Sequence, residues 1–209
     1  KSEQNLVWIG MSKETAHQLG TPLSSIMAWL ELLKMKGEKS EELSEIEKDV
    51  KRLEDITDRF SKIGSPARLE EQNLVDVLYE SVAYLEPRIS NRVRFHISME
   101  PDRQVIVPLN RQLFEWVVEN ICKNAVDAMN NAGNINIYIE EVNRHVNIDF
   151  EDTGKGMNKS QFKAIFKPGF TSKKRGWGLG LSLSKRIISD YHKGKIFVKS
   201  SVVDKGTTI

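Results

Sequence analysis

Apolar and small side chains recur along the first sixty residues in alternating steps of three and four. This spacing is typical of helices that pack along a coiled-coil seam. Gly37 and the polar residues up to Ser40 separate two such stripes, and Lys13 interrupts the first. Two amphipathic helices joined by a short turn cannot bury both apolar faces, so we expect a helical hairpin that pairs with a second copy as a four-helix bundle. The stripes comprise Leu6, Ile9, Ala16, Gly20, Leu23, Met27 and Leu30, then Leu43, Ile46, Val50, Leu53, Thr57 and Phe60.

The pattern changes after Gly64-Ser65-Pro66, which breaks the second helix. Helical periodicity then alternates with the two-residue period of strands. We expect helices at 74–85, 109–129 and 180–192, and strands at 92–99, 104–107, 134–142, 144–150, 195–201 and from 206 onward. Helices mixed with mostly hairpin-linked strands predict an α+β fold, with a two-layer α/β sandwich behind the hairpin. The predicted domains are therefore residues 1–64 and 65–209.

Composition narrows the class of protein. With 39% hydrophobic and 29% charged residues, the 209-residue chain is typical of a globular protein. A net charge of +2 gives no reason to expect nucleic acid or direct membrane contact. The single Cys122 excludes an internal disulfide, and no apolar run is long enough to span a bilayer. We expect a cytoplasmic piece of a longer protein, and membrane anchoring of the parent stays open.

His17 is the first candidate for chemistry. With Ala16, Gly20 and Leu23 on the seam, it lies beside the seam and faces solvent, and Pro22 kinks the helix just after it. For a lone histidine, an inert surface position is the alternative. The segment from His17 to Leu23, however, resembles the phosphoacceptor box of histidine kinases. That resemblance implies that His17 accepts the γ-phosphoryl group of ATP and passes it to an aspartate of a response regulator.

Two neighbours of His17 complete this box. Thr21, one turn on, matches the family residue that orients a hydrolytic water when the kinase dephosphorylates its regulator. Gln18 stands where the family usually has an acid. An amide can accept a hydrogen bond from the imidazole and fix its tautomer, but it cannot take up the proton. We therefore expect slower or differently assisted phosphoryl transfer rather than its loss.

Further motifs follow along the chain. Asn120 and Asn124 are four residues apart, so their amides share one helical face, and amide oxygens suit Mg²⁺. Ordinary helix-surface polarity is the alternative. Asp152 precedes closely spaced glycines that permit a tight turn, and its carboxylate can accept a hydrogen bond from an exocyclic amine. The glycines from Gly176 to Gly180 come directly before a helix, whose first N–H groups favour an anion.

Together these motifs resemble the four nucleotide-binding boxes of the GHKL (Bergerat) ATPase fold, shared by histidine kinases, heat-shock chaperones, mismatch-repair ATPases and type II topoisomerases. The resemblance implies ATP and Mg²⁺ as cofactors and a homodimer that phosphorylates a receiver domain. It assigns nucleotide binding to Asn120, Lys123, Asn124, Asp127, Asp152, Gly154, Gly156, Phe166, Thr171, Ser172, Lys173, Gly176, Gly178, Leu179, Gly180, Leu181 and Thr207.

Within that set the resemblance implies particular roles. Asn124, supported by Asn120, holds Mg²⁺, Lys123 approaches the phosphates, and Asp152 reads the adenine amine. The segment 166–175 forms a short mobile lid. Two other functions stay open: a chaperone-type or repair-type ATPase, which generally has glutamate where Asn120 stands and no helical hairpin, and a scaffold that binds ATP without transferring phosphate.

Overall fold

The computed structural model describes residues 23–37, 68–143, 145–171 and 178–209, together with 43, 44, 46, 47, 50, 51, 53 and 57. The chain divides into two compact units, residues 1–67 and 68–209. The first unit contains the predicted hairpin, and the second contains every strand of the described chain.

In the first unit, residues 23–35 form a helix, and the described residues between 43 and 57 are helical as well. Leu23, Leu30 and Val50 are buried against one another, with Met27 and Leu43 packed beside them. These are stripe positions, so the two predicted helices pack along the predicted seam. A 2.5 Å ion pair between Lys34 and Glu47 joins the helices at the edge of this cluster.

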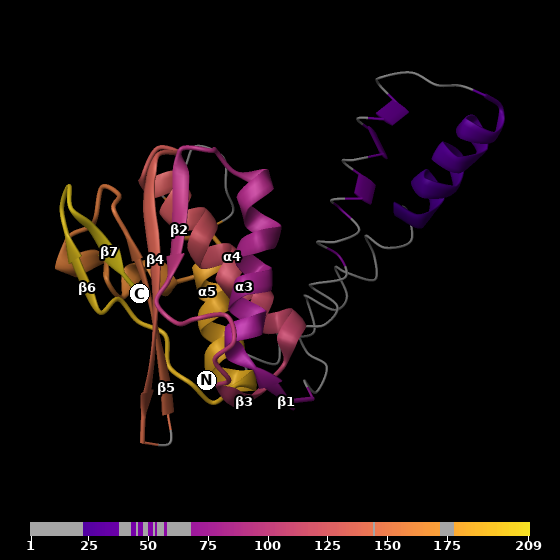
Figure 1. Ribbon diagram of the computed structural model, residues 1–209. Helices are drawn as coiled ribbons and strands as arrows, with labels where there is room; N and C mark the ends of the chain where they lie inside the picture. The colour runs from indigo at the N-terminus through magenta and orange to yellow at the C-terminus, as the bar shows by residue number, and fades with distance from the viewer. Residues whose placement is uncertain are drawn as a thin grey trace, which may run out of the picture. The chain divides into compact units, whose positions relative to one another are not determined.

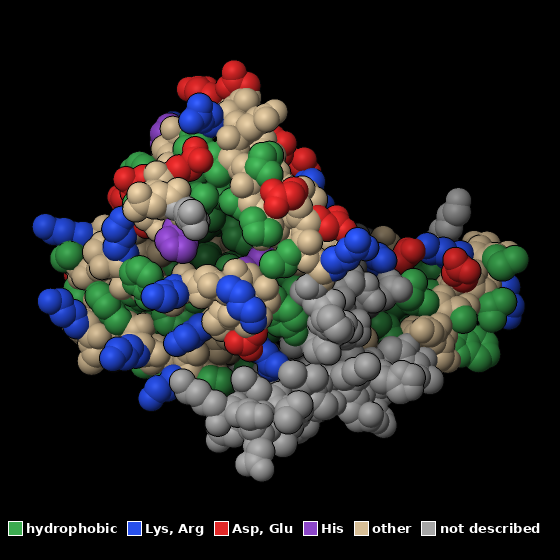
Figure 2. Space-filling model, turned by 90° about the horizontal axis from the view of Figure 1, so that it is seen from below, with side chains coloured by type: hydrophobic (Ala, Val, Ile, Leu, Met, Phe, Trp, Pro, Cys, Tyr) green, Lys and Arg blue, Asp and Glu red, His purple; other side chains and the backbone are tan. Residues whose placement is uncertain are grey.

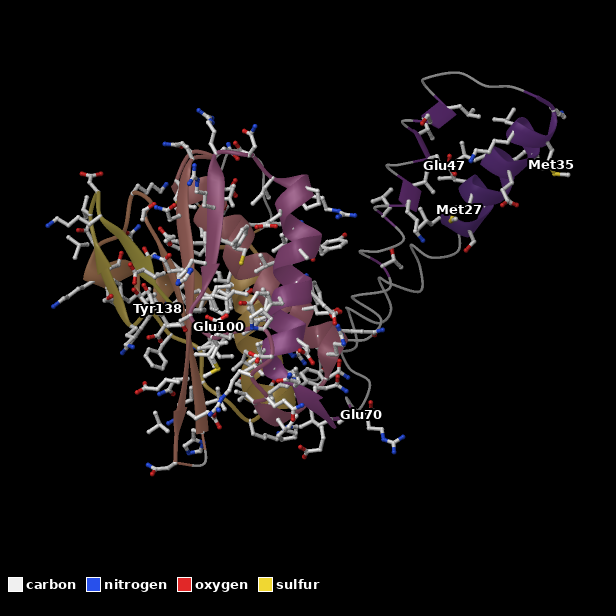
Figure 3. All side chains as sticks on the ribbon, in the orientation of Figure 1. Met27, Met35, Glu47, Glu70, Glu100 and Tyr138 are labelled. Atoms are coloured by element: carbon white, nitrogen blue, oxygen red, sulfur yellow. The ribbon has the colours of Figure 1, made fainter. Side chains whose placement is uncertain are left out.

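Two described members of the second stripe are exposed. Leu43 and Val50 are seven residues apart and face the first helix, whereas Ile46 and Leu53, also seven apart, are 48% and 51% exposed. On the first helix Trp29 is exposed too, and Met35 projects outward at the end of the helix (Figure 3). The hairpin therefore buries one apolar face and presents a second to its surroundings.

The second unit is a two-layer sandwich, in which helices α3 (Leu74–Leu85), α4 (Arg111–Ala128) and α5 (Gly180–Arg186) cover one face of a five-stranded sheet (Figure 1). The strand order is β2-β4-β5-β7-β6, and only the β2–β4 pair is parallel within it. The strands are β2 (Val93–Ile97), β4 (Gly133–Val142), β5 (His145–Asp152), β6 (Ser200–Val202) and β7 (Gly206–Thr208). The α+β prediction with a two-layer sandwich is confirmed.

Helix α3 (Leu74–Leu85) begins where Asn73 caps it, because the Asn73 side chain accepts a hydrogen bond from the backbone N–H of Val75 at 3.3 Å. The same oxygen accepts from the N–H of Val105 at 2.9 Å, which ties the helix to the segment before β3. Strand β3 (Ile106–Leu109) pairs with β1 (Glu70–Asn73) in a separate two-stranded sheet.

Helix α4 (Arg111–Ala128) packs its apolar face onto the sheet. The helix contacts β4 and β5, and the side chains of Val118 and Cys122 on α4 and of Ile135 and Ile137 on β4 are at most 1% exposed. Each fully buried aliphatic side chain contributes roughly 1.5–3 kcal/mol to the free energy of unfolding. The helix ends at Met129, after which Asn130 and Asn131 adopt positive φ angles of 52° and 61°.

Four elements differ most clearly from the predictions. Strand β1 lacks strand periodicity in the sequence and was not predicted, and β3 begins two residues after the predicted start. Helix α5 (Gly180–Arg186) continues as a π-helical turn over Ile187–Tyr191, since the N–H of His192 bonds to the carbonyl of Ile187. Strand β6 forms only at the end of the predicted segment 195–201. No helix of the described chain is both long and apolar enough to cross a membrane.

Cys122 provides a test of this packing. Burial raises the pKa of its thiol to about 12, so the reactive thiolate is scarce at neutral pH. We expect the native protein to resist alkylation by iodoacetamide at pH 8, and to react at the rate of a free thiol in guanidinium chloride. Mass spectrometry of the modified fraction over time measures this. Rapid alkylation of the native chain would contradict the described core.

Candidate active site

A pocket of about 790 Å³ opens between α4, the loop after β5 and the start of α5. Its floor is apolar and comes from the inner face of the sheet, through Ile135 of β4 and Phe150 of β5. Among the predicted site residues, those that line it are Asn120, Lys123, Asn124, Asp127, Asp152, Gly156, Thr171, Gly178, Leu179, Gly180, Leu181 and Thr207.

Asp152 is the buried carboxylate of this pocket. It ends β5, pairs across the sheet with Thr207 of β7, and accepts a hydrogen bond from the N–H of Gly154 at 2.8 Å. Burial raises the pKa of this carboxyl, and backbone hydrogen bonds from Gly154 and Thr207 oppose that rise. A carboxylate held in this way presents an acceptor of fixed direction to a ligand with an N–H donor.

Two glycines let the backbone close around Asp152. A Cβ on Gly156, whose φ is +60°, would lie 2.0 Å from the carbonyl oxygen of Val202. A Cβ on Gly206, with φ +117°, would lie 1.9 Å from the carbonyl oxygen of Asp152. Either side chain would push the β6–β7 hairpin away from the loop after β5. The close approach also places Ser201 at 2.9 Å from both the N–H of Met157 and the Thr207 hydroxyl.

The opposite wall combines the two asparagines of α4 with the start of α5. The Asn124 side-chain nitrogen donates to the carbonyl of Asn120 at 2.7 Å, which turns the Asn124 amide oxygen away from that carbonyl. The Asn120 side-chain nitrogen reaches the Gly180 carbonyl at 3.5 Å and the Ser184 hydroxyl at 3.4 Å. The two amides therefore share the pocket face of α4, and Asn120 connects α4 to α5.

The donor set of this wall fits Mg²⁺ held jointly with a ligand. Amide oxygens are hard, and Mg²⁺ usually takes one or two protein ligands together with waters and substrate phosphates. Among the described residues, no group of three or more His, Cys, Asp or Glu side chains is arranged to hold a metal by itself. Lys123, next along the wall, forms an ion pair with Glu119 one turn back, and its side chain is 56% exposed.

The net charge of +2 conceals a strong separation of charge along the chain. Residues 151–209 contain 13 Lys and Arg against four Asp and Glu, whereas residues 1–150 contain 18 against 25. Among the residues of this C-terminal part that the structure describes, nine lysines are exposed. In Figure 2 Lys and Arg side chains predominate over one part of the visible face, and Asp and Glu gather on another. A surface of this kind attracts anionic ligands to the pocket beside it.

Some predicted site residues lie elsewhere. Phe166 is buried in a small cluster with Ile165 and Val198, so it anchors the segment before residue 170 rather than facing the pocket. Gly154 packs against Ala128, where a Cβ would come within 2.8 Å of that residue's backbone. The other predicted positions lie outside the described residues: His17, Gln18, Thr21, Ser172, Lys173 and Gly176.

The sequence motifs missed the apolar part of the pocket. Ile135 and Phe150 were visible only as inward positions of alternating strands, which predicts burial and not a ligand-facing role. Met157 and Ile165 line the pocket as well, from the segment after Asp152. Arg88, on the short turn Glu86–Arg88, also lines it, and no sequence pattern marks that residue.

Comparison with known families identifies both units. Residues 10–66 match the "His Kinase A (phospho-acceptor) domain", and residues 110–209 match the "Histidine kinase-, DNA gyrase B-, and HSP90-like ATPase". Sporulation kinase D of Bacillus subtilis is 31% identical over 99% of this chain and 42% of its own length. Sensor histidine kinase ZraS of Salmonella typhimurium is 32% identical over 96% of this chain and 44% of its own. The chain thus spans less than half the length of these relatives.

Solved structures agree with the sequence matches. The catalytic domain of histidine kinase ThkA covers 67% of this chain and 91% of that chain, with a TM-score of 0.57 and 28% identity. ThkA in complex with response regulator protein TrrA matches over 100% of this chain and 62% of that chain, with a TM-score of 0.61 and 25% identity. The resemblance seen in the motifs is confirmed: the chain belongs to the sensor histidine kinases and carries the phosphoacceptor and ATPase domains of that family.

Proposed function

We propose that this chain uses ATP to phosphorylate its own His17 and then passes the phosphoryl group to an aspartate of a response regulator. The observation that carries the proposal is the pairing, in one chain, of a phosphoacceptor domain match that includes His17 with a pocket built around Asp152 and Asn124. Dephosphorylation of the regulator, with Thr21 orienting water, is part of the proposal. So is a cytoplasmic setting, where ATP is available.

Phosphoryl transfer requires positioning and charge neutralisation more than covalent machinery. In the first step a neutral His17 imidazole attacks the γ-phosphorus, an N–P bond forms, and the bond to the bridging oxygen breaks, so that ADP leaves with the electron pair. The attack requires the neutral imidazole, which has one ring nitrogen free of a proton. Gln18 holds the tautomer by accepting a hydrogen bond, and the proton leaves to another acceptor. In the second step an aspartate oxygen of the regulator takes the phosphoryl group and restores His17.

The pocket residues divide the work of binding. Asp152 accepts the hydrogen bond of the adenine amine above the apolar floor. Lys123 exchanges its partner Glu119 for the phosphates, and the Asn124 amide oxygen, supported by Asn120, holds Mg²⁺. When bound, Mg²⁺ neutralises charge on the phosphate oxygens. Residues 166–175 act as the lid. In the proposed domain division, residues 1–64 dimerise and accept the phosphoryl group, and residues 65–209 bind ATP.

Two partners follow from the same reasoning. The exposed apolar face of the hairpin, with Ile46, Leu53 and Trp29, supports a homodimer that buries it in a four-helix bundle. A response regulator receiver domain is the proposed acceptor, supported by the similarity to ThkA, whose structure contains response regulator protein TrrA.

The central prediction concerns His17. Incubation of the chain with ATP labelled in the γ-phosphate and Mg²⁺ should give a protein-bound label that is acid-labile and base-stable, as expected of phosphohistidine. His17→Ala should lose the label because no other residue is proposed to accept it. Gln18→Glu should raise the labelling rate, since a carboxylate can also take up the imidazole proton.

Nucleotide binding to His17→Ala, measured in parallel, is the control that its pocket is intact. Label that persists in His17→Ala would refute the proposal. An unlabelled wild type that still hydrolyses ATP would instead favour a chaperone-type ATPase, and one that only binds ATP would favour a scaffold. A lower labelling rate in Gln18→Glu would contradict the role given to Gln18.

A second prediction concerns Asp152. We expect Asp152→Asn to weaken ADP binding at least about tenfold, since a charge-assisted hydrogen bond is worth roughly 1.5–3 kcal/mol. Because burial raises the pKa of this carboxyl, protonation competes with the nucleotide as the pH falls. Affinity should therefore decline on acidification before the pH reaches about 3.9, the usual value for aspartate. Isothermal titration calorimetry from neutral pH down to about 3.9 measures both effects.

The matched control is Asp149→Asn. Asp149 lies on the same strand but pairs with Lys199 on the outer face of the sheet, to which Tyr138 also points (Figure 3). Its substitution should leave ADP affinity unchanged. Equal effects of the two substitutions would mean that Asp152 has no special role in nucleotide recognition.

A third prediction concerns assembly. Leu53→Glu should shift the chain from dimer to monomer, because it places a charge on the apolar face that the bundle would bury. Analytical ultracentrifugation over a range of protein concentrations measures this. Ile106→Glu is the control, since Ile106 is a similarly exposed apolar residue, 54% exposed, in the other unit. A wild type that is monomeric throughout, or an unaffected Leu53→Glu dimer, would contradict the proposed interface.

A further inference from the structure

Helices α4 and α5 run antiparallel, and the hydrogen bonds from Asn120 to α5 near the pocket are long. Gly180 and Ser184 of α5 lie beside Asn120, whereas His192, after the π-helical turn, lies beside Asn110 and Phe114. The two hydrogen bonds from Asn120 to α5 measure 3.4 and 3.5 Å, at the long limit for such bonds. These bonds alone define the placement of α5 along α4 poorly.

A better-formed contact lies at the other end of the two helices. The backbone N–H of Asn110, the residue that caps α4, donates to Nε2 of His192 at 3.1 Å. The Nδ1 of His192 lies 3.0 Å from the carbonyl oxygen of Ile187, and its ring packs edge-on against Phe114 with centroids 6.2 Å apart. Ile187 itself is fully buried. Asn110 and Asn120 are ten residues apart, or about 15 Å along the helix.

The partners of the ring define one chemical form. Because Nε2 accepts a hydrogen bond, it carries no proton, so the proton of the neutral ring is on Nδ1 and is donated to Ile187. Burial lowers the pKa of His192, which favours the same neutral form. The π-helical turn contributes to this arrangement, because the N–H of His192 reaches the same Ile187 carbonyl at 3.2 Å.

We propose that His192 is a positioning residue for the nucleotide site: it fastens the end of the α5 segment to the capped start of α4 and so sets where Gly180 meets Asn120. The residue touches no part of the pocket and acts through the two helices that form one of its walls. The inference rests on the proposed nucleotide binding. It also accounts for the π-helical turn, which delivers the ring to Asn110.

The test compares two substitutions by calorimetric titration with ADP and Mg²⁺. His192→Phe keeps an aromatic ring against Phe114 but removes the acceptor, and should weaken ADP binding at least about fivefold, a usual size for coupling between distant groups. His192→Gln keeps an oxygen acceptor in place of Nε2 and should stay within about twofold of wild type. Tyr79→Phe, which removes the 2.9 Å bond from α3 to the carbonyl of Met99, is the control and should not change ADP binding.

A second pair of variants tests the bond from its other end. Asn110→Ala loses the side-chain cap but keeps the backbone N–H, and Asn110→Pro loses both. The proline variant should bind ADP more weakly than the alanine variant, and this difference should disappear in a chain that also carries His192→Phe. If His192→Phe alone does not fold, the comparison of Asn110→Ala with Asn110→Pro still tests the role of the hydrogen bond to His192.

Each outcome has one meaning. Wild-type ADP affinity in folded His192→Phe, or equal losses in the Phe and Gln variants, overturns the positioning role. Equal binding by Asn110→Ala and Asn110→Pro overturns it as well. A wild-type chain that fails to bind ADP refutes the proposed nucleotide site instead, since the positioning role predicts differences only among variants of a chain that binds.

Discussion

The packing of helix α4 on the sheet is the interaction on which the rest of the ATPase unit depends. One side of this helix is apolar and buries Val118 and Cys122, and the helix contacts β4, whose Ile135 and Ile137 are buried as well. Its exposed side carries Asn120, Lys123 and Asn124 into the pocket. Because side chains of one helix keep fixed angular relations, the burial that stabilises the fold also orients the polar groups of the site. A substitution on the buried face that turned the helix would therefore also change the direction of the asparagine side chains.

At Asp152, burial and hydrogen bonding act in opposite directions on the pKa of one carboxyl. Burial raises its pKa, and the backbone N–H groups of Gly154 and Thr207 favour the charged form. These N–H groups can favour the charged form only because the backbone lies close to the carboxyl. That close approach requires Gly206 at a positive φ, in a contact that no side chain would allow. The β6–β7 hairpin is thus part of the site, although it contributes few side chains to the pocket.

Most of this organisation was predictable from the sequence, and the exceptions have physical reasons. Helix α3 and the β4–β5 hairpin follow from periodicity, and Asp152 and Asn124 follow from motifs. Strand β1, with the sequence Glu-Glu-Gln-Asn, has no apolar alternation, and it exists because β3 offers a partner. The π-helical turn before His192 occurs together with a tertiary hydrogen bond from Asn110 to the His192 ring, which no local pattern encodes. The apolar floor was predicted only as part of the strands 134–142 and 144–150, since burial under a helix and burial under a ligand give the same alternation.

The separation of charge along the chain is another feature that the overall composition does not predict. The net charge does not tell where the charged residues lie. The C-terminal residues 151–209 contain 11 Lys and two Arg, whereas residues 68–150 contain one Lys and seven Arg. Arginine forms directed, bidentate bonds to phosphate, while lysine acts as a hydrated point charge with little geometric demand. A lysine-rich surface therefore attracts a triphosphate from a distance without holding it in one pose. Under the proposed function, attraction without tight retention would favour the release of ADP after phosphoryl transfer, and specific recognition would be left to Asp152 and the asparagines.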